Sequence, residues 1–155
     1  MPNTAKDLVA ALENREDVRF GEISRALQDS PQDRERIVNE LMGMISWTNL
    51  SKAESAVNAL RFSGLLLEEA TYLHLLATAQ RMFPQERLVE LASQERIRER
   101  ERKTKTPPST KLLQSFLLAI FRHGGSSGME FVHSVEDSFQ GTAVPAWIES
   151  FRGGS

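Results

Sequence analysis

The densest group of residues able to do chemistry is a basic stretch between residues 94 and 111. Seven arginine and lysine side chains stand there against three glutamates, although the whole chain has a formal net charge of -2. Guanidinium groups bind phosphate through paired hydrogen bonds, so this pattern favours contact with a nucleic-acid backbone. The candidate phosphate- or partner-binding residues are Arg96, Arg98, Arg100, Arg102, Lys103, Lys105 and Lys111.

An exposed charged helix explains the same stretch without any ligand. Glu99 precedes Lys103 by four residues, which is a favourable charge pair on a helix surface. The interleaved glutamates cancel part of the positive field, and no aromatic side chain is present to stack on a base. We therefore expect a helical extension in which Arg98, Arg100 and Arg102 are largely exposed. Binding of a nucleic-acid backbone within a larger complex stays open as the alternative function.

The remaining polar residues form no catalytic or metal-binding pattern. His133, Glu136 and Asp137 come nearest to a ligand cluster, but this arrangement is more typical of a polar helix surface. The sequence contains no His-Glu-x-x-His motif, no Gly-x-Ser-x-Gly motif and no phosphate-binding glycine loop. It also contains no cysteine, which excludes disulfides and thiolate catalysis. We predict a protein that is not an enzyme and uses no metal or cofactor.

Length and composition are ordinary for a globular protein. The chain has 155 residues, of which 40% are hydrophobic, and this suits one domain with a hydrophobic core, or one such domain with an appendage. Residues 1–11 lack the basic start and apolar run of a signal peptide. The longest apolar run, residues 112–121, is about half of what a bilayer-spanning helix needs. We expect a soluble, cytoplasmic protein with no membrane partner.

The helix that organises the chain is predicted over residues 65–83. Apolar residues recur there at helical spacing, and Leu73 and Leu76 belong to the expected buried face. Glu68 lies in the first turn and Arg81 in the last, where the helix dipole favours each charge. A helix this apolar requires neighbouring helices to cover it.

Capping signals place the other helix starts. Ser30 with Pro31 predicts a helix that runs to about Trp47, and Ser51 with Glu54 forms a capping box for the next one. Further starts are expected at Asn3 or Thr4, at Pro84 and at Ser109 or Thr110, and the last of these opens a core helix that contains Phe116.

These patterns predict an all-α protein, because no stretch alternates as a strand would. The expected architecture is a multi-helix bundle or a short solenoid of helical hairpins of the HEAT or TPR kind, with about seven to nine helices. Residues 1–123 form the expected helical domain, with a charged extension and proline loop over residues 94–110. A Gly/Ser linker at 124–128, an amphipathic helical segment at 129–152 and a tail at 153–155 follow.

The segment 129–152 is short, amphipathic and marginal as an isolated helix, so it needs a groove. A glycine-serine run followed by such a segment is also what results when a separate peptide is joined to a protein by an engineered linker. We expect docking on an apolar groove of residues 1–123.

The predicted function is a non-catalytic protein–protein interaction module, an adaptor or scaffold subunit that binds an amphipathic helical peptide or a protein partner. The expected anchors of the docking segment are Phe131, Val135, Phe139, Trp147, Ile148 and Phe151.

Overall fold

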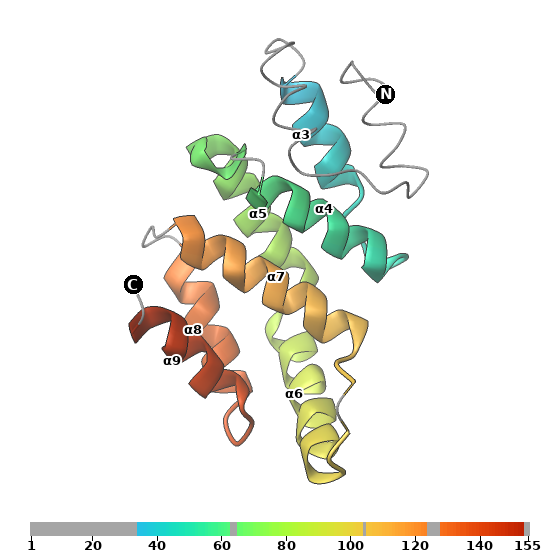
Figure 1. Cartoon of the computed structure of the whole chain (residues 1–155), viewed down its shortest axis with the longest axis vertical. Helices are drawn as coiled ribbons and strands as arrows, with labels where there is room; N and C mark the ends of the chain where they lie inside the picture. The colour runs from blue at the N-terminus through green and yellow to red at the C-terminus, as the bar shows by residue number, and fades with distance from the viewer. Residues whose placement is uncertain (1–33, 63–64, 104, 124–127, 154–155) are drawn as a thin grey trace. The chain divides into compact units, whose positions relative to one another are not determined.

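The computed structural model describes residues 34–62, 65–103, 105–123 and 128–153. Within these ranges the chain forms seven α-helices and one 3-10 turn, with no strand (Figure 1). The predicted all-α class is thereby confirmed. The helix starts expected at Asn3 or Thr4 and at Ser30 with Pro31 lie outside the described residues. In chain order the elements are α3 (Arg34–Gly43), α4 (Leu50–Phe62), η2 (Leu65–Leu67), α5 (Glu69–Met82), α6 (Gln85–Arg100), α7 (Pro108–His123), α8 (Met129–Ser138) and α9 (Val144–Gly153).

The described helices fall into two compact units that divide within α5. The first unit ends at Leu75 and contains α3, α4, η2 and the first half of α5. The second begins at Leu76 and contains the end of α5 and helices α6 to α9. Of the stretch expected as a linker, residues 124–127 lie outside the described part, and Gly128 directly precedes α8.

In the first unit α3 packs against α4, and α4 packs against η2. The inward face of α3 is aliphatic, and that of α4 consists mostly of small residues, which lets the helix axes approach closely. The buried residues of these two helices are Ile37, Val38, Leu41 and Met42 on α3 and Ala53, Ala56, Val57, Ala59 and Leu60 on α4.

Helix α3 ends at Gly43, four residues before the expected end at Trp47. Met44 and Ile45 follow it and are still buried, so their apolar side chains belong to the core without being helical. The Met44 N–H donates to the Leu41 carbonyl at 3.1 Å, which is a tight turn. Apolar spacing therefore extended the helix too far in the prediction.

The start of α4 is capped by Asn49 and not by Ser51. The Asn49 Oδ1 accepts a hydrogen bond from the Lys52 N–H at 3.0 Å, which is the geometry of an N-cap side chain binding the third helical residue. Ser51 is already inside the helix and exposed, so the predicted capping box with Glu54 is wrong.

The helix expected over residues 65–83 is interrupted, because η2 ends before α5 begins at Glu69. The buried stripe of α5 passes through Tyr72 and Leu75, both fully buried, and continues at every third or fourth residue. Leu73 lies one position away from this stripe and is 43% exposed. Its expected place in the core is therefore wrong.

The core of the second unit contains an aromatic pair, Phe83 and Phe116. Their ring centroids are 6.0 Å apart and the rings are nearly perpendicular, at 79°, which is a favoured edge-to-face contact. Phe116 is fully buried, as predicted. Helix α7 adds Leu112, Leu113, Leu117, Ala119 and Ile120 to this core, and α6 adds Leu88, Leu91 and Ala92.

Prolines open both α6 and α7. Pro84 has φ -68° and ψ 167°, so it is the extended residue before α6 and not its first helical residue. Helix α7 begins at Pro108, and the Lys111 N–H donates to the Pro107 carbonyl at 3.0 Å. A proline at the first helical position loses nothing, since its N–H would have no partner there. The start expected at Ser109 or Thr110 is therefore too late.

Candidate functional site

Helix α8 packs against α6 through its apolar face. Phe131, Val132 and Val135 are buried along the helix, and Phe139, the residue after it, is fully buried. Helix α9 packs against α8 and buries Ile148. The apolar side of the segment that follows the glycine-serine stretch is thus buried within the second unit.

The remaining expected anchors lie on α9. Trp147 is half-buried, and its ring centroid lies 6.4 Å from that of Phe121 on α7, with the planes tilted by 57°. The backbone of Phe151 belongs to α9, but its side chain lies outside the described part of the chain.

Arg96 binds the C-terminal end of α8. Its Nη2 donates to the Gln140 carbonyl at 2.7 Å and to the Ser138 carbonyl at 3.2 Å, and its Nε donates to Gln140 at 3.2 Å. The last carbonyls of a helix have no partner within the helix and carry a partial negative charge. The guanidinium therefore supplies both the hydrogen bonds and the charge that this helix end requires.

Glu99, one turn further along α6, binds the N-terminal end of α9. Its Oε1 and Oε2 accept the Ala143 N–H at 2.9 and 3.3 Å. The Ala143 carbonyl in turn accepts the Trp147 N–H at 3.0 Å, the first hydrogen bond of α9. A carboxylate at this position complements the positive end of the helix dipole. Glu99 thus has a partner other than Lys103.

Arg98 is held by a buried carboxylate. Glu95 is only 3% exposed, and its Oε2 accepts the Arg98 Nε–H at 3.0 Å while its Oε1 pairs with Nη2. The Arg98 Nη1 also donates to the Lys103 carbonyl at 3.0 Å. The hydrogen bond to Glu95 raises the pKa of Arg98, against a smaller opposing effect of burial. The expectation that Arg98 is largely exposed is wrong.

The other basic residues of the stretch remain exposed at the end of α6 and beyond. Lys103 pairs with Glu101, with 2.9 Å between Nζ and Oε2. The basic stretch therefore divides into Arg96 and Arg98, which bind partners within the second unit, and a set of exposed side chains. That exposed set comprises Arg100, Arg102, Lys103, Lys105 and Lys111.

Sequence reasoning overlooked the structural role of Glu95, although a signal was present. Leu88, Leu91 and Ala92 recur at helical spacing, and the next positions of the same stripe are Glu95 and Glu99. A carboxylate that continues an apolar stripe is expected to meet a cation or an N–H donor, as both of these do.

A cavity of about 330 Å³ lies beside the N-terminal half of α8. Phe83, Leu88 and Phe131 provide its apolar wall, and Gln80, Gln85, Glu130 and Ser134 its polar rim. Gln85 also donates to the Ser138 Oγ at 3.0 Å, which ties the start of α6 to α8.

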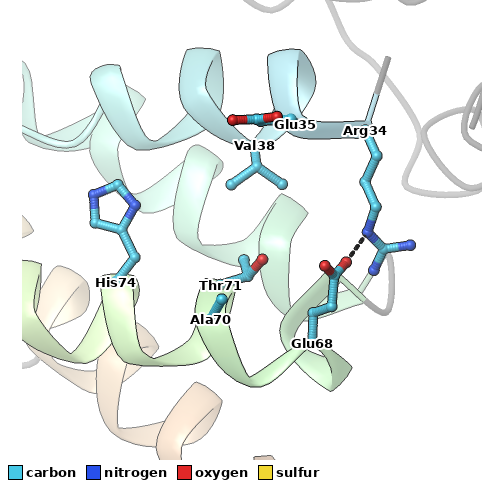
Figure 2. A pocket seen from close by; sticks show the side chains of 7 residues that line it. All are labelled: Arg34, Glu35, Val38, Glu68, Ala70, Thr71 and His74. Carbon is cyan, nitrogen blue, oxygen red and sulfur yellow. Dashed lines mark ion pairs between the residues drawn. The ribbon is translucent and has the colours of Figure 1, made fainter. Parts of the chain in front are cut away.

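A second cavity, of about 440 Å³, lies in the first unit between α3 and the start of α5 (Figure 2). Figure 2 shows Arg34 and Glu68 pointing toward each other as an ion pair. Because its one guanidinium is already paired and Glu35 adds a further carboxylate, this cavity does not have the charge that a phosphate site requires. Its lining residues are Arg34, Glu35, Val38, Glu68, Ala70, Thr71 and His74.

The described residues contain neither a metal-binding cluster nor a membrane-spanning helix. No group of three or more His, Asp or Glu side chains in this part of the chain is arranged to hold a metal ion. None of its helices combines the length and the apolar character needed to cross a membrane. Comparison of the chain with family models, curated proteins and solved structures gave no match.

Proposed function

We propose that the chain is a non-catalytic protein–protein interaction module, an adaptor or scaffold subunit of the cytoplasm that binds an amphipathic helical segment of a protein partner. The observation that carries this proposal is the packing of α8 against α6. The apolar face of α8 is buried, and side chains of α6 bind its C-terminal end. In this proposal, α8 and α9 of the same chain occupy the groove to which a helix of the partner protein binds.

The spacing of the anchors supports recognition of a helix. Phe131, Val135 and Phe139 follow one another at four-residue intervals, so they lie along one side of a helix, as in helix-in-groove complexes. Each such side chain contributes about 1.5–3 kcal/mol when it leaves water. A ten-residue helix is marginal alone in water, so most of its stability here must come from this burial.

The test uses the full chain with a protease site placed within residues 124–127. After folding and cleavage, the C-terminal fragment, which contains α8 and α9 and ends at Ser155, remains held only by non-covalent contacts. A fluorescent copy of this fragment is added, and its exchange into the cleaved protein is followed by anisotropy. We expect saturable binding that unlabelled fragment displaces.

A peptide with Val135→Asp should bind at least about tenfold more weakly, because the buried position cannot hold a charge without a partner. The matched control is His133→Asp, which changes an exposed position of the same helix and should leave affinity nearly unchanged. A cleaved protein that stays folded, releases its fragment and binds no peptide would exclude the proposal.

A nucleic-acid function makes a different prediction for the same protein. The exposed set that runs from Arg100 to Lys111 would then bind an oligonucleotide with an affinity that falls steeply as salt is raised. Docking through apolar anchors should respond little to salt. Arg96 and Arg98 already have internal partners, which reduces the number of guanidinium groups available to phosphate.

A further inference from the structure

The connection between α8 and α9, residues 139–143, is bound by two side chains of α6. We propose that the docking site recognises a helical hairpin and not a single amphipathic helix, with Arg96 and Glu99 as the residues that determine this specificity. The inference rests on the proposed function and adds the class of partner segment.

The two charges are matched to the two helix ends that meet in a hairpin turn. Arg96 binds the carbonyls at the negative end of α8, and Glu99 binds the N–H at the positive end of α9. They lie three residues apart on α6, so they project from the same side of the helix. A single helix that ends at Phe139 would offer Arg96 the Ser138 carbonyl but not that of Gln140, and it would leave Glu99 without its N–H donor.

Recognition of this turn uses main-chain atoms only. The acceptors of Arg96 are the carbonyls of Ser138 and Gln140, and the donor to Glu99 is the Ala143 N–H. Arg96 and Glu99 therefore make no hydrogen bond to a side chain of the turn, and the identity of its residues is restricted only by burial and by the backbone conformation.

Two residues of the turn maintain that conformation. Gly141 has φ +86°, a value that residues with a side chain rarely adopt. Space is not the obstacle, because a Cβ at this position would lie 3.7 Å from the Arg96 Nε, an ordinary van der Waals contact. The requirement for glycine is thus conformational and not steric. The Thr142 Oγ1 donates to the Phe139 carbonyl at 2.7 Å and accepts the Val144 N–H at 3.1 Å, which closes the turn.

The partner segment that fits is a pair of short amphipathic helices joined by five residues. The first of the five is apolar and buried like Phe139, the third is glycine, and the fourth is threonine or serine. The present chain supplies one such hairpin itself.

The test again uses the folded chain cleaved within residues 124–127, with two labelled peptides. One is the hairpin 128–153, and the other is an amidated peptide that ends at Phe139. We expect Glu99→Gln in the protein to weaken the hairpin by about threefold to tenfold and to leave the single-helix peptide unchanged. Arg96→Lys should weaken the hairpin about tenfold, because one ammonium does not reproduce a fork bound to two carbonyls.

Comparison of each variant's effect on the two peptides isolates the turn, because the affinity difference between the peptides alone would also include the lost contacts of Ile148 and Trp147. Arg100→Gln is the matched control, an exposed charge on the same helix that should affect neither peptide. In the hairpin, Gly141→Ala should weaken binding at least about threefold.

Two results would overturn the inference in distinguishable ways. If Glu99→Gln and Arg96→Lys change hairpin affinity no more than Arg100→Gln, the turn is not recognised, although helix docking stands. If the folded, cleaved chain binds neither peptide, the proposed function fails and the inference fails with it.

Discussion

Arg98 and Glu95 lie one turn apart on α6, and two N–H groups of the guanidinium bind the two oxygens of the buried carboxylate. The third donor atom of Arg98 reaches the Lys103 carbonyl, beyond the end of the helix. One side chain thus neutralises a buried charge and holds the chain where α6 ends. An exposed arginine in a charged helix would do neither.

Arg98→Gln should lower the free energy of unfolding by about 2 kcal/mol. The substitution leaves the Glu95 carboxylate buried without its cation, a loss that costs up to about 3–5 kcal/mol when both partners are fully buried and less for the partly exposed Arg98. Arg100→Gln removes the same charge from an exposed position and should change stability by less than about 0.5 kcal/mol. The midpoints of urea denaturation compare the two variants. Equal midpoints would show that the buried Glu95 carboxylate does not need Arg98 as its partner.

Leu75→Ala should cost about 2–5 kcal/mol, whereas Leu73→Ala should cost less than about 1 kcal/mol. Both changes remove the same atoms from the same helix, so helix propensity cancels in the comparison. Leu75 is fully buried and Leu73 is 43% exposed, so only the first leaves a cavity. A larger loss for Leu73 in thermal or urea unfolding would mean that the buried stripe of α5 runs through Leu73.

The existence and type of the helices were predictable, but the register of α5 was not. Apolar residues at three- and four-residue spacing predict a helix, but they do not show which of two neighbouring stripes of side chains is buried. In residues 72–76 the sequence offers Tyr72, Leu73, Leu75 and Leu76, and helical periodicity alone does not choose among them. The choice is made by neighbouring helices, which act through packing at long range in the sequence.

In the docking segment, residues 129–152, some features likewise follow from the local sequence and others depend on tertiary contacts. The apolar positions of α8, such as Phe131 and Val135, follow from spacing within one helix. The roles of Arg96 and Glu99 do not, because their partners lie 42 to 44 residues away in the sequence. Both residues look like solvated charges until the turn between α8 and α9 is placed beside them.

Asn49→Ala should destabilise the chain by about 1 kcal/mol, since it removes the side-chain acceptor of the Lys52 N–H at the start of α4. Ser51→Ala, which alters the residue that the sequence pattern suggested as the cap, should change stability by less than about 0.5 kcal/mol. Thermal unfolding of the two variants compares them directly. A greater loss for Ser51→Ala would restore the capping box as the start of this helix.

Arg102, two residues beyond the end of α6, has a backbone conformation that favours glycine. Its φ is +55°, the Lys103 N–H donates to the Arg98 carbonyl at 3.0 Å, and the Arg102 N–H donates to the Glu99 carbonyl at 3.2 Å. This pair of hydrogen bonds around a left-handed residue is the Schellman motif. A side chain in that region costs about 1–2 kcal/mol relative to right-handed backbone, a cost that glycine escapes.

Arg102→Gly should therefore raise the free energy of unfolding by about 0.5–1 kcal/mol, because the relief of strain exceeds the greater chain entropy that glycine adds to the unfolded state. Arg102→Val should lower it by about 1 kcal/mol or more, since a β-branched residue tolerates positive φ least. Removal of the charge is common to both variants and cancels in the comparison. Hydrogen exchange of the Lys103 amide provides a local readout, with slower exchange expected for glycine and faster exchange for valine. Equal stability of the two variants would show that the chain leaves α6 by another route.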